Sequence, residues 1–124
     1  MAYDVVCLRP EADFTRVGVM PPASLTIAYR APDEADTAAL IAAARGVVMA
    51  AMGPKLPGAL FEKSAVEIVQ ITGAGVDRLD DAVLKRVGAA VCNVPGGSNT
   101  AVADYAVTSA SVLLRRFAWA DRRS

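Results

Sequence analysis

Short apolar runs alternate along the chain with segments of helical periodicity, and this alternation predicts a parallel α/β sheet. A short apolar run bounded by Gly, Pro or Asp is typical of a strand that is covered on both faces. The runs that fit this description lie at residues 4–8, 25–29, 47–51, 66–71 and 89–93. Because parallel strands need crossover connections, helices are expected between them, on both faces of the sheet.

Helix start and stop signals occur in the intervals between the apolar runs. The expected helices cover residues 9–17, 32–45, 58–63, 80–86 and 100–117. The sequence contains neither an internal repeat nor a linker before the last helix. The simplest architecture is therefore one flavodoxin-like domain of about five parallel strands, followed by a long C-terminal helix.

The last expected helix is apolar over much of its circumference. A helix of this kind has to be covered on more than one side. One face of a sheet cannot cover every turn, so a partner surface is expected. Its apolar residues are Ala101, Val102, Ala103, Ala106, Val107, Ala110, Val112, Leu113 and Leu114.

Charge and length exclude several classes of function. The chain carries 13 basic and 13 acidic residues, and this balance argues against binding to nucleic acid or to an anionic membrane. The arginines near the C-terminus are interpreted as a solvated helix end that the helix dipole favours. The apolar stretch 101–114 is interrupted by Asp104 and is too short to span a bilayer.

The number and positions of the cysteines indicate in which cellular compartment the protein is expected. Cys7 and Cys92 lie far apart within apolar runs, and the sequence contains no histidine and no metal-ligand spacing. Buried reduced thiols, no metal and a cytoplasmic location are therefore expected. The N-terminal apolar run is too short for a signal peptide.

The first segment whose groups could bind a ligand is Thr72–Asp77, at the end of the fourth apolar run. Gly73 and Gly75 flank Ala74, so backbone N–H groups can approach a ligand without obstruction by a Cβ atom. At the carboxyl end of a parallel strand these amides could hold a carboxylate or a phosphate. A tight strand-to-helix turn without a ligand is the alternative, and the residues alone leave both open.

The same glycines do not begin a dinucleotide fingerprint. The third glycine of G-x-G-x-x-G would fall at Arg78, whose side chain would obstruct close packing of helix and strand. No other segment supplies the fingerprint, so the chain contains no recognisable dinucleotide site.

The second segment is Asn93–Tyr105, in which a Pro-Gly-Gly loop leads from a strand into the last helix. Ser98 or Asn99 is a suitable N-cap, and Asp104 lies near the positive end of the helix dipole. This structural role needs no ligand. Alternatively, Ser98 and Asn99 offer hydrogen bonds to a small polar ligand at the helix N-terminus.

Taken together and in this order, the two segments resemble the D-isomer-specific 2-hydroxyacid dehydrogenases. That family carries G-x-G-x-D, followed by N-x-P-x-x-N-[ST]-x-x-V-A-E at the start of a long helix. The corresponding residues here are Gly73–Asp77 and Asn93–Asp104. The resemblance covers most of the chain and is strongest from Val66 to Arg116.

The resemblance implies a role for each part of the chain. The amides of Ala74 and Gly75, with Gly73 beside them, would hold the substrate carboxylate, and Ser98 and Asn99 would lie at the cleft between two domains. Residues 1–99 would form the substrate-binding domain. Residues 100–124 would form the crossover helix to a nucleotide-binding domain that this chain lacks, and the segment Ala101–Phe117 would make the contacts of a homodimer.

Three departures from the family pattern affect these expectations. The order of Ser98 and Asn99 is the reverse of the usual Asn-[ST] pair, and Asp104 replaces the usual Glu. Family members often place Arg or Ser after the third strand, where this chain has Ala51–Gly53. The loss of that polar contact favours a substrate with a less polar tail.

Catalysis in the family depends on an arginine, a Glu–His pair and NAD or NADP, all supplied by the nucleotide domain or by later segments. With no histidine and no fingerprint, this chain alone is expected to be inactive. The alternative function is a stand-alone flavodoxin-like module that dimerises and binds a small anion or nothing. A phospho-accepting receiver domain is disfavoured, because residues 5–9 contain no acidic cluster for Mg²⁺.

Overall fold

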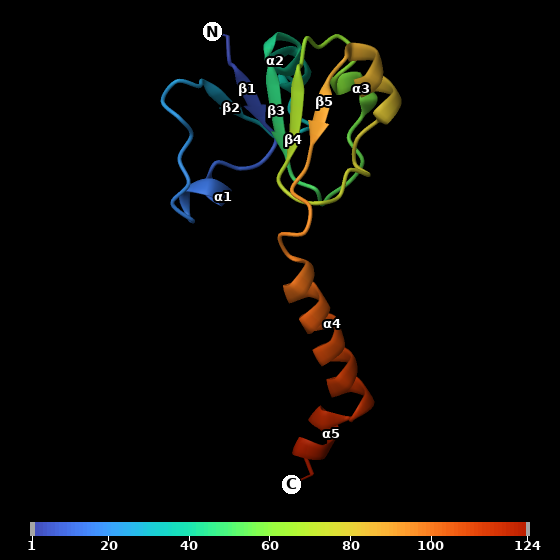
Figure 1. Cartoon of the computed structure of the whole chain (residues 1–124). Coiled ribbons are helices and arrows are strands. Elements are labelled where there is room, and N and C mark those ends of the chain that lie inside the picture. The colour runs from blue at the N-terminus through green and yellow to red at the C-terminus, as the bar shows by residue number, and fades with distance from the viewer. Residues whose placement is uncertain (1, 124) are drawn as a thin grey trace.

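The computed structural model describes residues 2–123 and contains one five-stranded, all-parallel sheet in the order β2-β1-β3-β4-β5 (Figure 1). The strands are β1 (Val5–Cys7), β2 (Ile27–Tyr29), β3 (Gly46–Met49), β4 (Ile68–Ile71) and β5 (Ala90–Cys92). Four of them lie within apolar runs of the sequence, and β3 overlaps the run 47–51 but begins one residue earlier, at Gly46. The parallel α/β class expected from those runs is confirmed.

Helices fill the connections between the strands, as parallel pairing requires. They are α1 (Ala12–Thr15), α2 (Thr37–Ala43), the 3₁₀ helix η1 (Gly58–Leu60), α3 (Asp81–Val87), α4 (Asn99–Leu114) and α5 (Phe117–Asp121). The expected boundaries of α3 are confirmed most closely. The Asp80 carboxylate accepts a hydrogen bond from the Val83 amide at 3.2 Å, and Gly88 ends the helix in the left-handed conformation.

One face of the sheet forms the core. Val6, Val47 and Val69 lie side by side across β1, β3 and β4, and each is at most 1% exposed. Ile41 of α2 and Phe61, which follows η1, belong to the same buried cluster. Burial of these apolar side chains is the main term that stabilises the domain.

The opposite face is covered over β1 and β2 by the segment that contains α1. Phe14 packs against Tyr29 with ring centroids 6.4 Å apart. This cover leaves Cys7 only 3% exposed, and burial raises the pKa of its thiol. The position of Cys7 agrees with the buried thiol expected from the sequence, whereas Cys92 is partly exposed.

Three of the expected helices are shorter in the structure, and the one expected at 58–63 is only the 3₁₀ helix Gly58–Leu60. The helix expected at 9–17 reduces to Ala12–Thr15, and the one expected at 32–45 begins only at Thr37. Before α2, the Glu34 carboxylate accepts a hydrogen bond from the Ala31 amide at 2.6 Å, and the Thr37 hydroxyl donates to the Ala31 carbonyl at 2.7 Å. These local side-chain bonds satisfy the backbone in a turn and compete with helix there.

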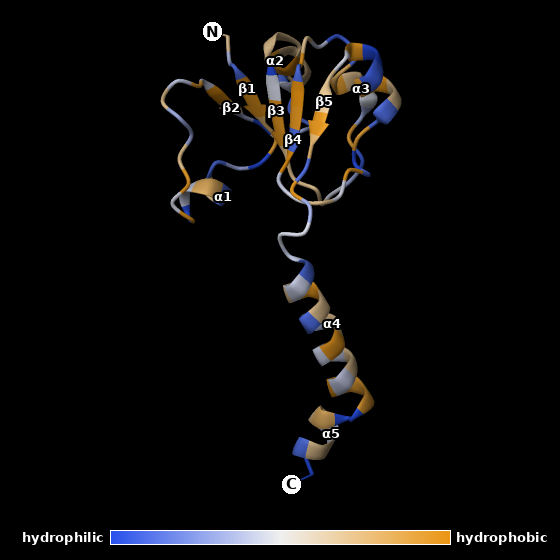
Figure 2. Cartoon of the chain, viewed as in Figure 1, coloured by the Kyte–Doolittle hydropathy of each residue, from blue (hydrophilic) through white to orange (hydrophobic). Residues whose placement is uncertain are grey.

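The last helix also differs from expectation, because it breaks before Phe117. Arg116 has φ 49° in the left-handed region, which ends α4 at Leu114 and starts α5 in a new direction. α4 extends away from the sheet (Figure 1), and residues of high hydropathy occur along its whole length (Figure 2). None of its residues is buried. Among residues 2–123, no helix is long and apolar enough to cross a membrane.

Candidate functional site

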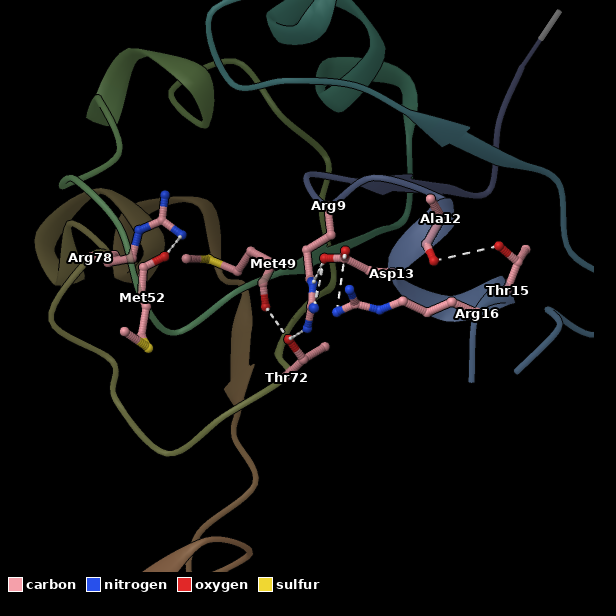
Figure 3. Close-up of polar contacts among 9 residues, drawn as sticks. All are labelled: Arg9, Ala12, Asp13, Thr15, Arg16, Met49, Met52, Thr72 and Arg78. Carbon is pink, nitrogen blue, oxygen red and sulfur yellow. Dashed lines mark hydrogen bonds and ion pairs between the residues drawn. The ribbon is translucent and has the colours of Figure 1, made fainter. Parts of the chain in front are cut away.

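A pocket of about 770 Å³ lies at the carboxyl ends of β1, β3 and β4. Loops after three parallel strands meet here, which is the usual place for a ligand in an open α/β sheet. The pocket is lined by Arg9, Ala50, Ala51, Met52, Gly53, Thr72, Gly73, Ala74, Gly75, Asp77 and Ser98. Figure 3 shows Arg9 and Thr72 meeting from separate loops, whereas Met52 lies beside Arg78.

The glycine loop, Gly73–Gly75, presents its N–H groups without internal partners. Its carbonyls are used elsewhere: that of Gly73 accepts from the Val94 amide at 2.9 Å, and that of Ala74 accepts from the Asn93 side-chain amide at 2.8 Å. Within residues 2–123, no acceptor pairs with the amides of Gly73, Ala74 or Gly75. Since backbone donors need partners, a ligand that only accepts hydrogen bonds suits this loop.

Close packing explains why this loop contains glycine. A Cβ atom at position 73 would lie 2.7 Å from the Ala51 Cβ atom, and one at position 75 would lie 3.0 Å from an Asp77 carboxylate oxygen. The loops after β3 and β4 are therefore in direct contact. Any side chain at Gly73 would push these two walls of the pocket apart.

Arg9 is the cationic residue in the lining of this pocket. Its Nη1 donates to the Thr72 hydroxyl at 2.7 Å, and its Nε and Nη2 donate to one Asp13 oxygen at 3.1 and 2.8 Å. The Thr72 hydroxyl in turn donates to the Met49 carbonyl at 3.2 Å (Figure 3). The ion pair with Asp13 orients the guanidinium but does not remove it from the pocket.

Four of the five residues singled out from the sequence line this pocket: Gly73, Ala74, Gly75 and Ser98. Asn99 is not in the lining and begins α4 instead. Ser98 stands at the N-cap position, but its side chain makes no capping hydrogen bond. The hydroxyl of Ser98 is thus not engaged by the helix that follows it.

Sequence reasoning missed Arg9 as a member of the pocket, and it included Thr72 and Asp77 only as the ends of the glycine-containing segment, without a role for their side chains. The available signal was position, because Arg9 lies two residues after the end of β1 and Thr72 directly follows β4. Carboxyl ends of parallel strands share one edge of the sheet, so polar residues at these points come together.

A second pocket of about 560 Å³ adjoins the first and shares Arg9, Ala50, Met52 and Gly53 with it. Its lining is rich in apolar side chains and prolines and also includes charged residues. The residues that line this pocket but not the first are Leu8, Pro10, Asp13, Pro32, Asp33, Pro54, Lys55, Leu56, Pro57 and Arg78. It offers room for an extension of any ligand held in the first pocket.

The glycine loop does not fit a dinucleotide. Arg78 stands where the third glycine would allow close helix packing, and its side chain is buried against the loop after β3. The next helix, α3, begins only at Asp81. Within the described residues, no group of three or more His, Cys, Asp or Glu is placed to hold a metal ion.

The fold is therefore an open, all-parallel α/β domain with unpaired amides at the carboxyl edge of its sheet. The chain matches the family model of the D-isomer specific 2-hydroxyacid dehydrogenase catalytic domain over residues 18–120. It therefore belongs to the D-isomer-specific 2-hydroxyacid dehydrogenases. No curated protein matches it in a search by sequence.

Solved structures share the fold at low identity. A D-2-hydroxyisocaproate dehydrogenase aligns with TM-score 0.65 and 21% identity over 91% of this chain. A D-lactate dehydrogenase from Treponema pallidum aligns with TM-score 0.64 and 21% identity over 90% of this chain. An NAD⁺-bound 3-phosphoglycerate dehydrogenase from Entamoeba histolytica aligns with TM-score 0.60 and 18% identity over 87%. The match covers only 36%, 35% and 38% of those chains, respectively.

Proposed function

We propose that this chain is the substrate-binding part of an NAD(P)-dependent D-2-hydroxyacid dehydrogenase and that it orients a small 2-hydroxy or 2-oxo acid. The observation that carries this proposal is the row of unpaired amides at Gly73, Ala74 and Gly75. A carboxylate accepts hydrogen bonds and cannot donate them, and bonds to an ionised acceptor are the stronger kind. The amides of Ala74 and Gly75 would hold it, with Gly73 beside them.

The surrounding side chains support the same orientation. Arg9 brings positive charge to the pocket, and Ser98 brings a hydroxyl that is not engaged in capping. By family position, Asn99 would face the cleft between the domains together with Ser98. Met52 is 86% exposed at the boundary of the two pockets, which supports a substrate whose tail is less polar than its carboxylate end.

The division of the chain follows from this role. Residues 1–99 would form the substrate-binding domain and residues 100–124 the crossover helix toward a nucleotide-binding domain. That domain would bind NAD or NADP and supply the acid–base residues, since the 124 residues contain no histidine. We expect no hydride transfer by these residues alone. The unpaired cysteines, Cys7 and Cys92, are consistent with a reducing cytoplasm.

A homodimer through the segment Ala101–Phe117, most of which is α4, is part of the proposal. Val107 and Leu114 of α4 are 67% and 83% exposed, which is unusual for large apolar residues that lie on one helix face. A second copy of the chain would cover them. Contact between two such helices would remove apolar surface from water in both copies.

The proposal is tested by calorimetric titration of the chain with pyruvate and, as a probe without a carboxylate, with acetone. Ala74→Pro removes one amide donor from the glycine loop, whereas Ala74→Gly keeps that donor. We expect pyruvate to bind the wild type and Ala74→Gly, to bind Ala74→Pro about tenfold more weakly, and acetone not to bind. Equal pyruvate affinity for Ala74→Pro and Ala74→Gly would show that the loop amides do not hold the carboxylate.

A further inference from the structure

Arg78 is a buried cation whose partners are carbonyl groups alone. The residue is 7% exposed, and within residues 2–123 no carboxylate forms an ion pair with it. Its Nε donates to the Pro54 carbonyl at 2.8 Å, and its Nη1 donates to the carbonyls of Ala50 and Met52 at 2.8 and 2.9 Å. Figure 3 shows the guanidinium beside Met52.

All three carbonyls belong to one loop, residues 50–54, which follows β3 and is called the β3 loop below. The β3 loop folds around the guanidinium: Gly53 has φ +126°, and a Cβ atom there would lie 3.0 Å from the Arg78 Cζ atom. The backbone of Arg78 adds a fourth link, because its carbonyl accepts from the Leu56 amide at 2.8 Å. The shape of the β3 loop therefore depends on this one residue.

Arg78 also stands three residues after Gly75, at the end of the segment that carries the glycine loop. Ala51 of the β3 loop touches Gly73 closely enough to exclude a Cβ atom there, and Met52 and Gly53 line both pockets. Arg78 thus joins the two loops that form opposite walls of the proposed carboxylate site. A movement of the β3 loop would change the space in front of the unpaired amides.

Energetic considerations favour a role for Arg78 in shaping the β3 loop over a role in stability alone. A buried charge is costly unless it is paired or well hydrogen-bonded, and an apolar side chain of similar size is often as stabilising. A guanidinium instead offers five donors in a fixed planar fork, which can hold several carbonyls in one arrangement. The three side-chain bonds of Arg78 use that property within a single short loop.

We propose that Arg78 is a positioning residue, which holds the β3 loop against the glycine loop in the arrangement that receives the substrate carboxylate. This inference rests on the proposed function for the identity of the ligand. It extends that function by assigning the shape of the site to a side chain that does not line the pocket of the glycine loop. It also gives a reason for arginine at the position where a dinucleotide fingerprint would need glycine.

The test compares wild type, Arg78→Ala, Arg78→Lys and the control Arg86→Ala, in which an exposed arginine of α3 is removed. Pyruvate affinity is measured by NMR titration, and hydrogen exchange is measured at the amides of Met52 and Leu56. We expect Arg78→Ala to weaken pyruvate binding about tenfold and to speed exchange at Leu56. The pyruvate affinity and the Leu56 exchange rate of Arg78→Lys should lie between those of wild type and Arg78→Ala, since an ammonium group can bond only some of the carbonyls. Both quantities should match wild type in Arg86→Ala.

Added methylguanidinium separates positioning from general stability. It should restore pyruvate binding to Arg78→Ala, and it should leave the wild type and Arg86→Ala unchanged. If Arg78→Ala does not fold, Arg78→Lys provides the same comparison of affinity and exchange. Wild-type affinity and wild-type exchange in a folded Arg78 variant would overturn the proposal. Failure of the wild type to bind pyruvate would instead overturn the proposed function, and exchange at Leu56 would still decide whether Arg78 holds the β3 loop.

Discussion

The guanidinium Nη1 of Arg9 lies 2.7 Å from the hydroxyl oxygen of Thr72, although the two residues are 63 positions apart in the sequence. Arg9 follows β1 and Thr72 follows β4, so this bond ties together two strand ends that are not neighbours in the sheet. The β3 loop lies between them and is held by Arg78. The walls of the pocket are therefore fixed by bonds between loops as well as by the sheet.

Replacement of Thr72 by Val tests the first of these bonds. The change keeps the shape of the side chain but removes the acceptor for Arg9 and the donor to the Met49 carbonyl. We expect a loss of about 1–2 kcal/mol in the free energy of unfolding, measured by urea denaturation. Thr15→Val is the matched control, because the Thr15 hydroxyl makes only a long, exposed contact of 3.5 Å with the Ala12 carbonyl. An equal loss in the two variants would contradict this assignment.

Gly73→Ala tests the contact between the two loops. The added Cβ atom would lie 2.7 Å from the Ala51 Cβ atom, which is rigid and cannot rotate away. We expect a destabilisation of about 1–3 kcal/mol from overpacking, together with weaker binding of pyruvate. At Gly97, a Cβ atom would meet its nearest atom, in Val94, at 3.8 Å, so Gly97→Ala should be tolerated. A Gly73→Ala variant as stable as Gly97→Ala would mean that the loops can separate without cost.

The self-association of α4 is tested by placing charges on its apolar surface. Val107 and Leu114 are seven residues apart and lie on one helix face. In sedimentation experiments, we expect the wild type to form a dimer and Val107→Asp/Leu114→Asp to be a monomer. The control Thr108→Asp/Ser109→Asp adds the same charge at polar positions that lie off this face, and it should remain dimeric. A wild-type chain that stays monomeric at high concentration would rule out the proposed dimer.

Stability below about pH 4 is expected to depend on Asp4. Hydrogen bonds from the Thr26 side chain and amide lower the pKa of Asp4 below its ordinary value of 3.8. A lowered pKa means that this carboxylate stabilises the fold above its unfolded-state pKa and that the contribution is lost as the pH falls through the folded-state pKa. Asp4→Asn should reduce the dependence of the unfolding free energy on pH in that range. Asp33→Asn serves as the control, and an identical pH profile for wild type and Asp4→Asn would refute this expectation.

The sequence predicted the sheet well because strand and helix signals are local. All five apolar runs became strands, and Asp80 and Gly88 marked the ends of α3 as their chemistry requires. The break at Arg116 was not predictable, because arginine gives no local signal for a left-handed conformation. The start of α2 was missed for a related reason, since it depends on the side chains of Glu34 and Thr37 rather than on periodicity.

The candidate site was predicted only in part. The glycines at positions 73 and 75 indicated a loop whose backbone is open to a ligand. The roles of Arg9 and Arg78 instead depend on which loops the order of strands in the sheet brings together. That order places β3 between β1 and β4, and no local pattern encodes it. Arg78 was considered only as an obstacle to dinucleotide binding, because its three carbonyl partners lie 24 to 28 residues away in the sequence.

The central claim is that the amides of Ala74 and Gly75, with Gly73 beside them, receive the carboxylate of a small 2-oxo acid. The most direct measurement is a residue-resolved NMR titration of the ¹⁵N-labelled chain with pyruvate, and separately with NADH. The proposed function predicts that pyruvate shifts the amide resonances of these three residues in a saturable way, and that NADH leaves them unchanged. Saturable binding of pyruvate with shifts elsewhere, or no binding at all, would contradict it.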